Sequence, residues 1–240
     1  MPYPGGKHAP GHYISSGIAH PWVFKSAAST VMAPLEAGRD ANAPGGISAN
    51  DLLHVSLFSS PNIVTPAGWT LLFSGNIDAY WRIATADAND DFAIPVGTDT
   101  ETGRLVIFSC FRRAGEVPVL ISFGAVDQVG GTPGPMIIAD MPFDQSAFLF
   151  TLLIASTNRS GVDPVQIPAF TDVQLPWRNT ITPLYEEWGG VTDRFAYLGT
   201  AFYLEPNGGV KPASAFNWSQ FEGSLQGTAS DSRAPRWDIV

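Results

Sequence analysis

Residues 50–57 read Asn-Asp-Leu-Leu-His-Val-Ser-Leu, residues 65–72 read Thr-Pro-Ala-Gly-Trp-Thr-Leu-Leu, and residues 79–85 read Ala-Tyr-Trp-Arg-Ile-Ala-Thr. In the first segment, the apolar side chains that share one face are Leu53, Val55 and Leu57. We expect the second segment to repeat this alternation with Trp69, Leu71 and Phe73 on one face. Alternation of this kind predicts three half-buried β-strands.

Turn-forming residues separate these strands. Pro66 and Gly68 predict a tight turn that leads Trp69 into the second strand. The loop 75–78, which reads Gly-Asn-Ile-Asp, predicts a hairpin that leads to the third strand with Tyr80 and Trp81. We therefore assign structural roles, in turns and core, to Pro66, Gly68, Trp69, Tyr80 and Trp81.

The rest of the chain repeats the same pattern of short apolar runs between turn formers. Eleven strands are expected, at Leu52–Phe58, Trp69–Ser74, Ala79–Thr85, Phe92–Val96, Leu105–Phe111, Val119–Val126, Met136–Ala139, Phe148–Ser156, Phe170–Val173, Phe195–Leu204 and Ser214–Phe221. The runs 105–111 and 148–154 are apolar on both faces, which is typical of central strands. The fold class predicted is all-β, an antiparallel β-sandwich of jelly-roll-like form.

Three regions are expected. Residues 1–46 are rich in Pro and Gly and predict an extended N-terminal arm, although 22–24 and 30–32 could be short strands. Residues 47–227 form the sandwich, either as one unit or as two related halves at about 47–126 and 136–222, because Trp69 and Trp188 each lead through Gly into an aromatic strand. Residues 228–240 read as an extended tail, in which an exposed Trp237 would be costly. We therefore expect the tail and the arm to dock on a neighbouring subunit.

Composition restricts the partners. The chain has 240 residues and a formal net charge of −9, so nucleic acid is not an expected partner, because phosphate binding needs a basic face. No apolar run approaches the roughly 18 residues that span a bilayer, and no signal peptide pattern is visible, so we expect synthesis in a cytoplasm without membrane insertion. The single cysteine, Cys110, lies in an apolar run and is expected to be a buried thiol rather than a nucleophile.

The three opening segments resemble a family of phage and prophage structural proteins, in which a Gly-Asp-Leu-Leu strand, a Pro-Ala-Gly-Trp-Thr turn and a Tyr-Tyr-Lys-Val-Ala-like strand recur. The resemblance covers about 47–126, with Ala49-Asn50 departing from the usual Ala-Gly or Pro-Gly. It implies a virion structural protein of tail, head fibre or capsid decoration type. Its expected partners are other virion proteins and copies of itself, and its expected location is the virion. A contact with host surface polysaccharide is a further expectation that comes from the residues and not from the resemblance.

Glycan binding is the ligand function that the residues favour most. Sandwich rims present aromatic rings to the apolar faces of sugars, while polar side chains bond the hydroxyls. The candidate residues, all in expected loops, are Trp177, Arg178, Asn179, Tyr185, Trp188, Asp193 and Arg194. The same residues could instead form a subunit interface. A stand-alone carbohydrate-binding module or lectin is the alternative function.

Catalytic and metal chemistry have weaker signals. Glu186-Glu187-Trp188 would suit a glycan-degrading enzyme, but adjacent strand residues diverge, and no catalytic residue is assigned. Asp51 and His54 are expected on opposite faces of their strand, which argues against a catalytic pair and favours a packed histidine. An oxygen-rich run could hold Ca²⁺ through Asp87, Asn89, Asp90 and Asp91, although a solvated turn is favoured and no cofactor is expected.

Overall fold

The computed structural model describes residues 22–58, 64–74, 77–85, 90–94, 103–114, 117–129, 135–138, 147–158, 172–173, 178–182, 184–188, 194–209, 214–217 and 229–238. These residues form β-strands and connections without an α-helix. The described part of the chain accordingly holds no helix long and apolar enough to cross a membrane. The all-β class predicted from the sequence is confirmed.

The strands are β1 (Trp22–Met32), β2 (Arg39–Ala41), β3 (Leu52–Phe58), β4 (Thr70–Phe73), β5 (Ile77–Ile83), β6 (Phe92–Ile94), β7 (Arg104–Arg113), β8 (Val119–Val129), β9 (Pro135–Ile138), β10 (Ala147–Asn158), β11 (Asp172–Val173), β12 (Arg178–Asn179), β13 (Leu184–Trp188), β14 (Arg194–Gly209), β15 (Ser214–Asn217) and β16 (Ala229–Asp238). Each of the eleven expected strands has a counterpart among them. The five strands without one are β1, β2, β12, β13 and β16.

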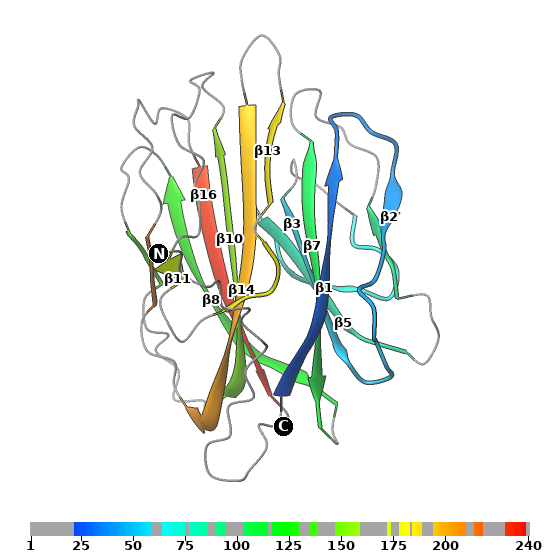
Figure 1. Cartoon of the computed structure of the whole chain (residues 1–240), viewed down its shortest axis with the longest axis vertical. Helices are drawn as coiled ribbons and strands as arrows, with labels where there is room; N and C mark the ends of the chain where they lie inside the picture. Colours follow the sequence, from blue (N-terminus) through cyan, green and yellow to red (C-terminus); the bar gives the residue numbers. More distant parts are fainter. Residues whose placement is uncertain are drawn as a thin grey trace, which may run out of the picture.

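The described pairings are all antiparallel and build two large sheets. The first sheet has the order β1-β7-β3-β5-β4, and the second has the order β12-β14-β10-β16-β8, with β13 also paired to β14. A small sheet of β2 and β6 lies beside the first sheet, and β11, β15 and β9 form a further sheet. Figure 1 shows the second sheet on the left, the first sheet on the right and β2 outside it.

The first sheet is buried on both faces. Its inner face meets the second sheet in a cluster that joins Leu52 and Phe111 to Leu198 and Trp237, which we call the inner core. Its outer face meets the small sheet in a second cluster, the outer core. All seven residues of β3 are therefore buried, because successive side chains enter the two cores in turn. The central position expected for the run 105–111 is confirmed, since β7 lies between β1 and β3.

The predicted turn before β4 is present. The N–H of Trp69 donates to the carbonyl of Pro66 over 3.1 Å, and Gly68 has a φ of +79°, the value that the third position of a type II turn requires. The turn places the Trp69 ring in the outer core, edge-on to Phe92 and Phe108. The turn at 66–69 thus has a structural role, because it leads the chain into β4 and positions Trp69 in the outer core.

Replacing Gly68 by alanine is expected to lower the free energy of unfolding by about 1–2 kcal/mol, because an L side chain is disfavoured at this φ. The added Cβ would meet only Arg82 Nη1 at 3.7 Å, so the cost comes from the backbone and not from a clash. Gly45→Ala is the matched control, since its Cβ meets nothing within 4 Å and its φ is not positive. Urea unfolding measures both, and an equal change in the two variants would contradict the prediction.

The alternation expected over Trp69, Leu71 and Phe73 is wrong. Trp69 enters the outer core, Leu71 is exposed and Phe73 enters the inner core. The ladder between β4 and β5 shifts register between Leu71 and Phe73. A β-bulge of this kind adds one residue to one strand, so the side chains beyond it change faces.

The segment expected as an N-terminal arm contributes strands to this chain's own sheets. β1 pairs with β7 along its whole length, from Trp22 opposite Arg113 to Met32 opposite Arg104. The short strands considered at 22–24 and 30–32 are the two ends of β1, and small residues lie half-buried between them. Arg39–Ala41 then forms β2 against β6. Residues 1–21 lie outside the described residues.

The C-terminal tail is extended, as expected, but most of it is a strand of the second sheet. β16 lies between β10 and β8, and Trp237 is fully buried in the inner core. The ladder with β10 is interrupted at 234–235, where Pro235 has no N–H to donate. Trp237 is therefore buried by other strands of this chain rather than by a neighbouring subunit.

The two halves suggested by the sequence do not coincide with the two large sheets. β4–β5 and β13–β14 are both antiparallel pairs, as the two Trp-Gly segments suggest, and they lie in different sheets. However, β8 falls in the first suggested half and pairs with β16 in the second sheet. The pairing of distant strands thus crosses the suggested boundary.

Candidate functional site

The candidate glycan-binding residues that the structure describes lie on β12, β13 and β14 at one edge of the second sheet. β12 and β13 both pair with β14, so residues 178–188 run antiparallel to residues 202–194. Arg178 and Asn179 belong to β12, Tyr185 and Trp188 to β13, and Arg194 begins β14. Trp177 and Asp193 lie outside the described residues.

The register divides these candidates into two groups. Arg178 is opposite Phe202, whereas Trp188 is opposite Arg194, eight residues away along β14. A strand rises by about 3.3 Å per residue, so the two ends are about 26 Å apart. The residues do not converge on one small pocket. Trp188 and Arg194, as direct cross-strand neighbours, form the compact end, and Arg178 is exposed at the other end.

The acidic run has protein partners where it is described. Asp90 is buried and forms an ion pair with Arg82 at 2.6 Å, and the Arg82 guanidinium lies 5.5 Å from the centre of the Trp69 ring. Asp91 accepts a hydrogen bond from the N–H of Ala43 at 2.7 Å. Asp87 and Asn89 lie outside the described residues, and the described residues contain no group of three acidic, His or Cys side chains that could hold a metal.

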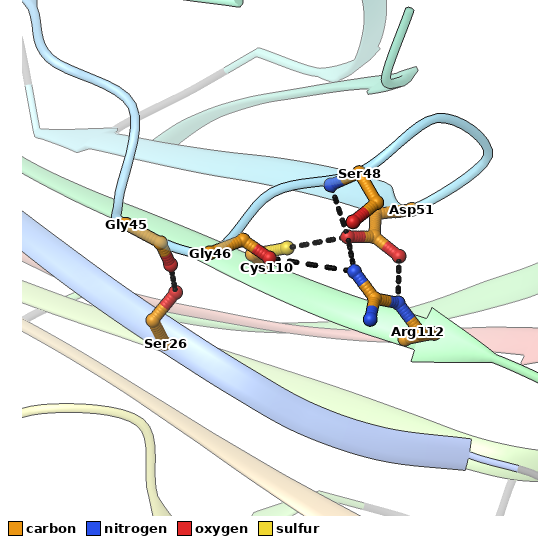
Figure 2. Close-up of polar contacts among 7 residues, drawn as sticks. All are labelled: Ser26, Gly45, Gly46, Ser48, Asp51, Cys110 and Arg112. Atoms are coloured by element: carbon orange, nitrogen blue, oxygen red, sulfur yellow. Dashed lines mark hydrogen bonds and ion pairs between the residues drawn. The ribbon is translucent and has the colours of Figure 1, made fainter. Parts of the chain in front are cut away.

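The most concentrated polar cluster surrounds Asp51, immediately before β3 (Figure 2). Its carboxylate accepts two hydrogen bonds from Arg112, both 2.7 Å long, and one of 2.8 Å from the N–H of Ser48. The Cys110 thiol lies 3.7 Å from the same carboxylate. The Asp51 side chain is 1% exposed and that of Arg112 is 35% exposed. The paired strands β3 and β7 bring these residues together.

This cluster holds the loop that joins the small sheet to β3. Arg112 also donates to the carbonyl of Gly46, and the Ser26 hydroxyl donates to the carbonyl of Gly45 (Figure 2). Gly46 and Asn50 both have positive φ values, of +83° and +69°. Gly and Asn tolerate this region better than other residues do. The arrangement is that of a structural clamp, and sequence reasoning missed the Asp51–Arg112 pair because the two residues are 61 positions apart.

The chemistry of Cys110 follows from its place in this cluster. The thiol is fully buried, and burial raises its pKa to about 12, with the nearby Asp51 carboxylate acting in the same direction. The thiol therefore stays protonated at neutral pH, whereas the thiolate is the nucleophilic form. This agrees with the buried, unreactive thiol expected from the sequence.

Cys110 is expected to be unreactive toward a thiol reagent such as DTNB in the folded protein at pH 8, because it is buried and protonated. Full reaction with one thiol per chain is expected after unfolding in urea. Absorbance of the released thionitrobenzoate measures both states. Rapid stoichiometric reaction in the folded state would contradict the burial of this thiol.

A second polar cluster lies on the outer face of the first sheet. Asp78 is buried and accepts a hydrogen bond from the Ser74 hydroxyl at 2.5 Å. Burial raises the pKa of Tyr80, with Asp78 adding to the effect, and burial lowers the pKa of Arg104. Asp78 and Arg104 were not identified from the sequence, whereas Tyr80 was assigned a structural role and is buried, as expected.

The inner face of the first sheet carries a third group of buried polar side chains. His54 and Ser56 lie two residues apart on β3, and Ser109 of β7 is opposite His54. The expectation that Asp51 and His54 lie on opposite faces is confirmed, because Asp51 contacts Arg112 while His54 contacts Trp237 in the inner core. The expected packed histidine is also confirmed, with His54 2% exposed.

The two adjacent glutamates lie on β13. Glu186 is opposite Ala196 and Glu187 is opposite Phe195. Because successive residues of a strand belong to opposite faces, this placement agrees with the divergence expected from the sequence. A glycosidase needs two carboxyl groups held across one bond, and neighbouring strand positions do not provide that arrangement.

Comparison of this chain with family models, with curated proteins and with solved structures finds no match.

Proposed function

We propose that this protein is a virion structural protein of a phage, in a tail, head fibre or capsid decoration, with the jelly-roll-like arrangement of the family that it resembles. It assembles with other virion subunits and with copies of itself. The proposal rests on the resemblance of residues 50–85 to that family and on the structural use that the fold makes of those residues.

The observation that carries the proposal is the position of this motif. β3 and β5 are neighbours in the middle of the first sheet, and the turn at 66–69 places Trp69 in the outer core with Tyr80. The buried motif residues thus support both cores, while Gly68, Thr70 and Leu71 are exposed at the turn and at the start of β4. The buried Asp51 and Asp90 are each paired with an arginine. These features favour a rigid building block.

The test is immunogold electron microscopy of particles from the native source, with an antibody against the recombinant chain. Gold at one fixed place on heads, tails or fibres is the expected result, and it would also locate the subunit. Gold on cells, or nowhere on particles, would reject the virion function. Pre-immune serum on the same particles is the control.

We further propose that the protein contacts host surface polysaccharide at the edge of the second sheet formed by β12, β13 and β14. We assign this contact to the compact end, where Trp188 and Arg194 are cross-strand neighbours. A glycan array should show a specific hit that Trp188→Ala with Arg194→Ala removes. Arg178→Ala is the matched control, because it lies about 26 Å away along β14. Absence of any hit would remove the glycan contact and leave the structural role.

A further inference from the structure

Three buried polar side chains lie side by side between the two large sheets. His54 and Ser109 are direct cross-strand neighbours, and Ser56 follows on the same face of β3. His54 Nε2, Ser56 Oγ and Ser109 Oγ have no hydrogen-bond partner in the described part of the structure. Buried polar atoms are normally paired, so this patch is an unusual feature of an otherwise apolar layer.

His54 joins this patch to the C-terminal strand of the other sheet. Its ring meets the Trp237 indole edge-on at 6.0 Å between centres. Trp237 also meets Trp81 at 5.4 Å and donates a hydrogen bond of 2.9 Å to the Thr151 hydroxyl. This one indole therefore connects β16 and β10 of the second sheet to β3 and β5 of the first.

Most charged residues of the first sheet face away from His54. The charged residues on its outer face are Asp51, Asp78, Arg82, Arg104 and Arg112, and Lys25 of β1 is exposed. Arg113 shares the face of Ser109 but is four residues farther along β7, or about 13 Å away. It is a cation and cannot stabilise a second positive charge.

No described contact joins a carboxylate of the second sheet to His54. β10 contains no charged residue. In β16 the charged positions are Asp231, Arg233, Arg236 and Asp238, of which the last two flank Trp237. Asp231 is six residues from Trp237, about 20 Å along the strand, and Asp127, the charged residue of β8, is opposite Asp231.

In β14 the charged residues are Arg194, at the start of the strand, and Glu205. Glu205 follows Leu204, which is level with Trp237 through Leu149, so it is two strands away from β16. Glu186, in the middle of β13, is opposite Ala196, which is eight residues along β14 from Leu204 and so about 26 Å from the level of Trp237.

We infer that His54 and Trp237 form an acid-sensitive latch between the two sheets, which protonation of the imidazole releases. A neutral imidazole packs against the indole without burying a charge. An imidazolium in the same place is a buried charge, and the Ser56 and Ser109 hydroxyls can accept a hydrogen bond from it but cannot neutralise it. Separation of β16 from the first sheet lets water reach the ring.

The direction of the pH effect follows from the two states of His54. Burial lowers its pKa to about 3 in the folded protein, against 6.5 as the ordinary value that applies after unfolding. The unfolded chain therefore binds this proton first as the pH falls. The contribution of His54 to stability is complete above about pH 6.5, and below it the folding constant falls by up to about tenfold per pH unit toward pH 3.

The first test is urea unfolding at pH 7 and pH 5 of the wild type and of His54→Gln. Between these pH values the wild-type folding constant should fall about 25-fold more than that of His54→Gln. The matched control replaces the other three histidines, His8→Asn, His12→Asn and His20→Asn, and should keep the wild-type response. An equal pH dependence in the wild type and His54→Gln would overturn the inference.

Two further measurements use the wild-type chain and stay informative if the variant does not fold. NMR titration of the His54 ring should show no midpoint above about pH 4.5, and a midpoint near pH 6.5 would overturn the inference. Hydrogen exchange, corrected for its intrinsic pH dependence, should lose protection at pH 5 in β16 and β10 before β3, β5 and β7. Equal loss across both sheets would show global unfolding instead of a latch.

Discussion

Replacing Trp237 by alanine is expected to lower the free energy of unfolding by about 3–5 kcal/mol, the range for removing a fully buried large aromatic side chain. Trp237 is 0% exposed and fills the inner core between β10 and the first sheet. The substitution also leaves the Thr151 hydroxyl without its donor. Urea unfolding followed by circular dichroism measures the change.

Trp237→Phe is the matched control for that variant. It keeps a ring beside His54 and Trp81 but loses the N–H that bonds Thr151, so the expected cost is only about 1–2 kcal/mol. The result also tests where the tail docks. If Trp237→Ala left the stability of the isolated chain unchanged and weakened only its oligomer, the tail would dock on a neighbouring subunit and the placement of β16 would be wrong.

Replacing Asp51 by alanine is expected to lower the free energy of unfolding by about 2–4 kcal/mol. The carboxylate is 1% exposed and accepts bonds from Arg112 and from the N–H of Ser48. Its removal takes the acceptor from the Ser48 N–H and leaves Arg112 only the carbonyl of Gly46. Breaking a fully buried ion pair costs about 3–5 kcal/mol. The expected value is lower here, because the Arg112 side chain is 35% exposed and water can solvate it.

Glu36→Gln is the control for Asp51→Ala. It breaks the Arg39–Glu36 ion pair, whose side chains are 46% and 32% exposed, and such surface pairs contribute about 0–1 kcal/mol. Both variants are measured by urea unfolding at pH 7. A loss below about 1 kcal/mol for Asp51→Ala would show that the clamp around the 46–51 loop is not a stabilising element.

The pattern of apolar residues along the chain predicted a strand well where at least one face of that strand is apolar. β3 has the bounds expected from Leu52–Phe58, and β7 extends the expected run by one or two residues at each end. β16 was missed as a strand because its sequence is polar and contains Pro235, which reads as an extended tail. β1 was divided into two because small residues occupy its middle.

Candidate site residues were less predictable, because a site depends on residues that are distant in sequence. The list from Trp177 to Arg194 was chosen by composition, and the register along β14 separates Arg178 from Trp188. The Asp51–Arg112 clamp and the His54–Trp237 contact were not visible, since their members are 61 and 183 positions apart.

The sequence by itself determined the all-β class, the turn that carries Trp69 and the alternation that buries Leu53, Val55 and Leu57, because these depend on neighbouring residues. Only the tertiary structure decided which strands pair, that the first sheet has a core on each face, and that the chain's own β16 covers the inner core. Alternation specifies an apolar face for each strand. It does not specify the partner of that face, because many pairings bury similar apolar area and only the whole fold selects among them.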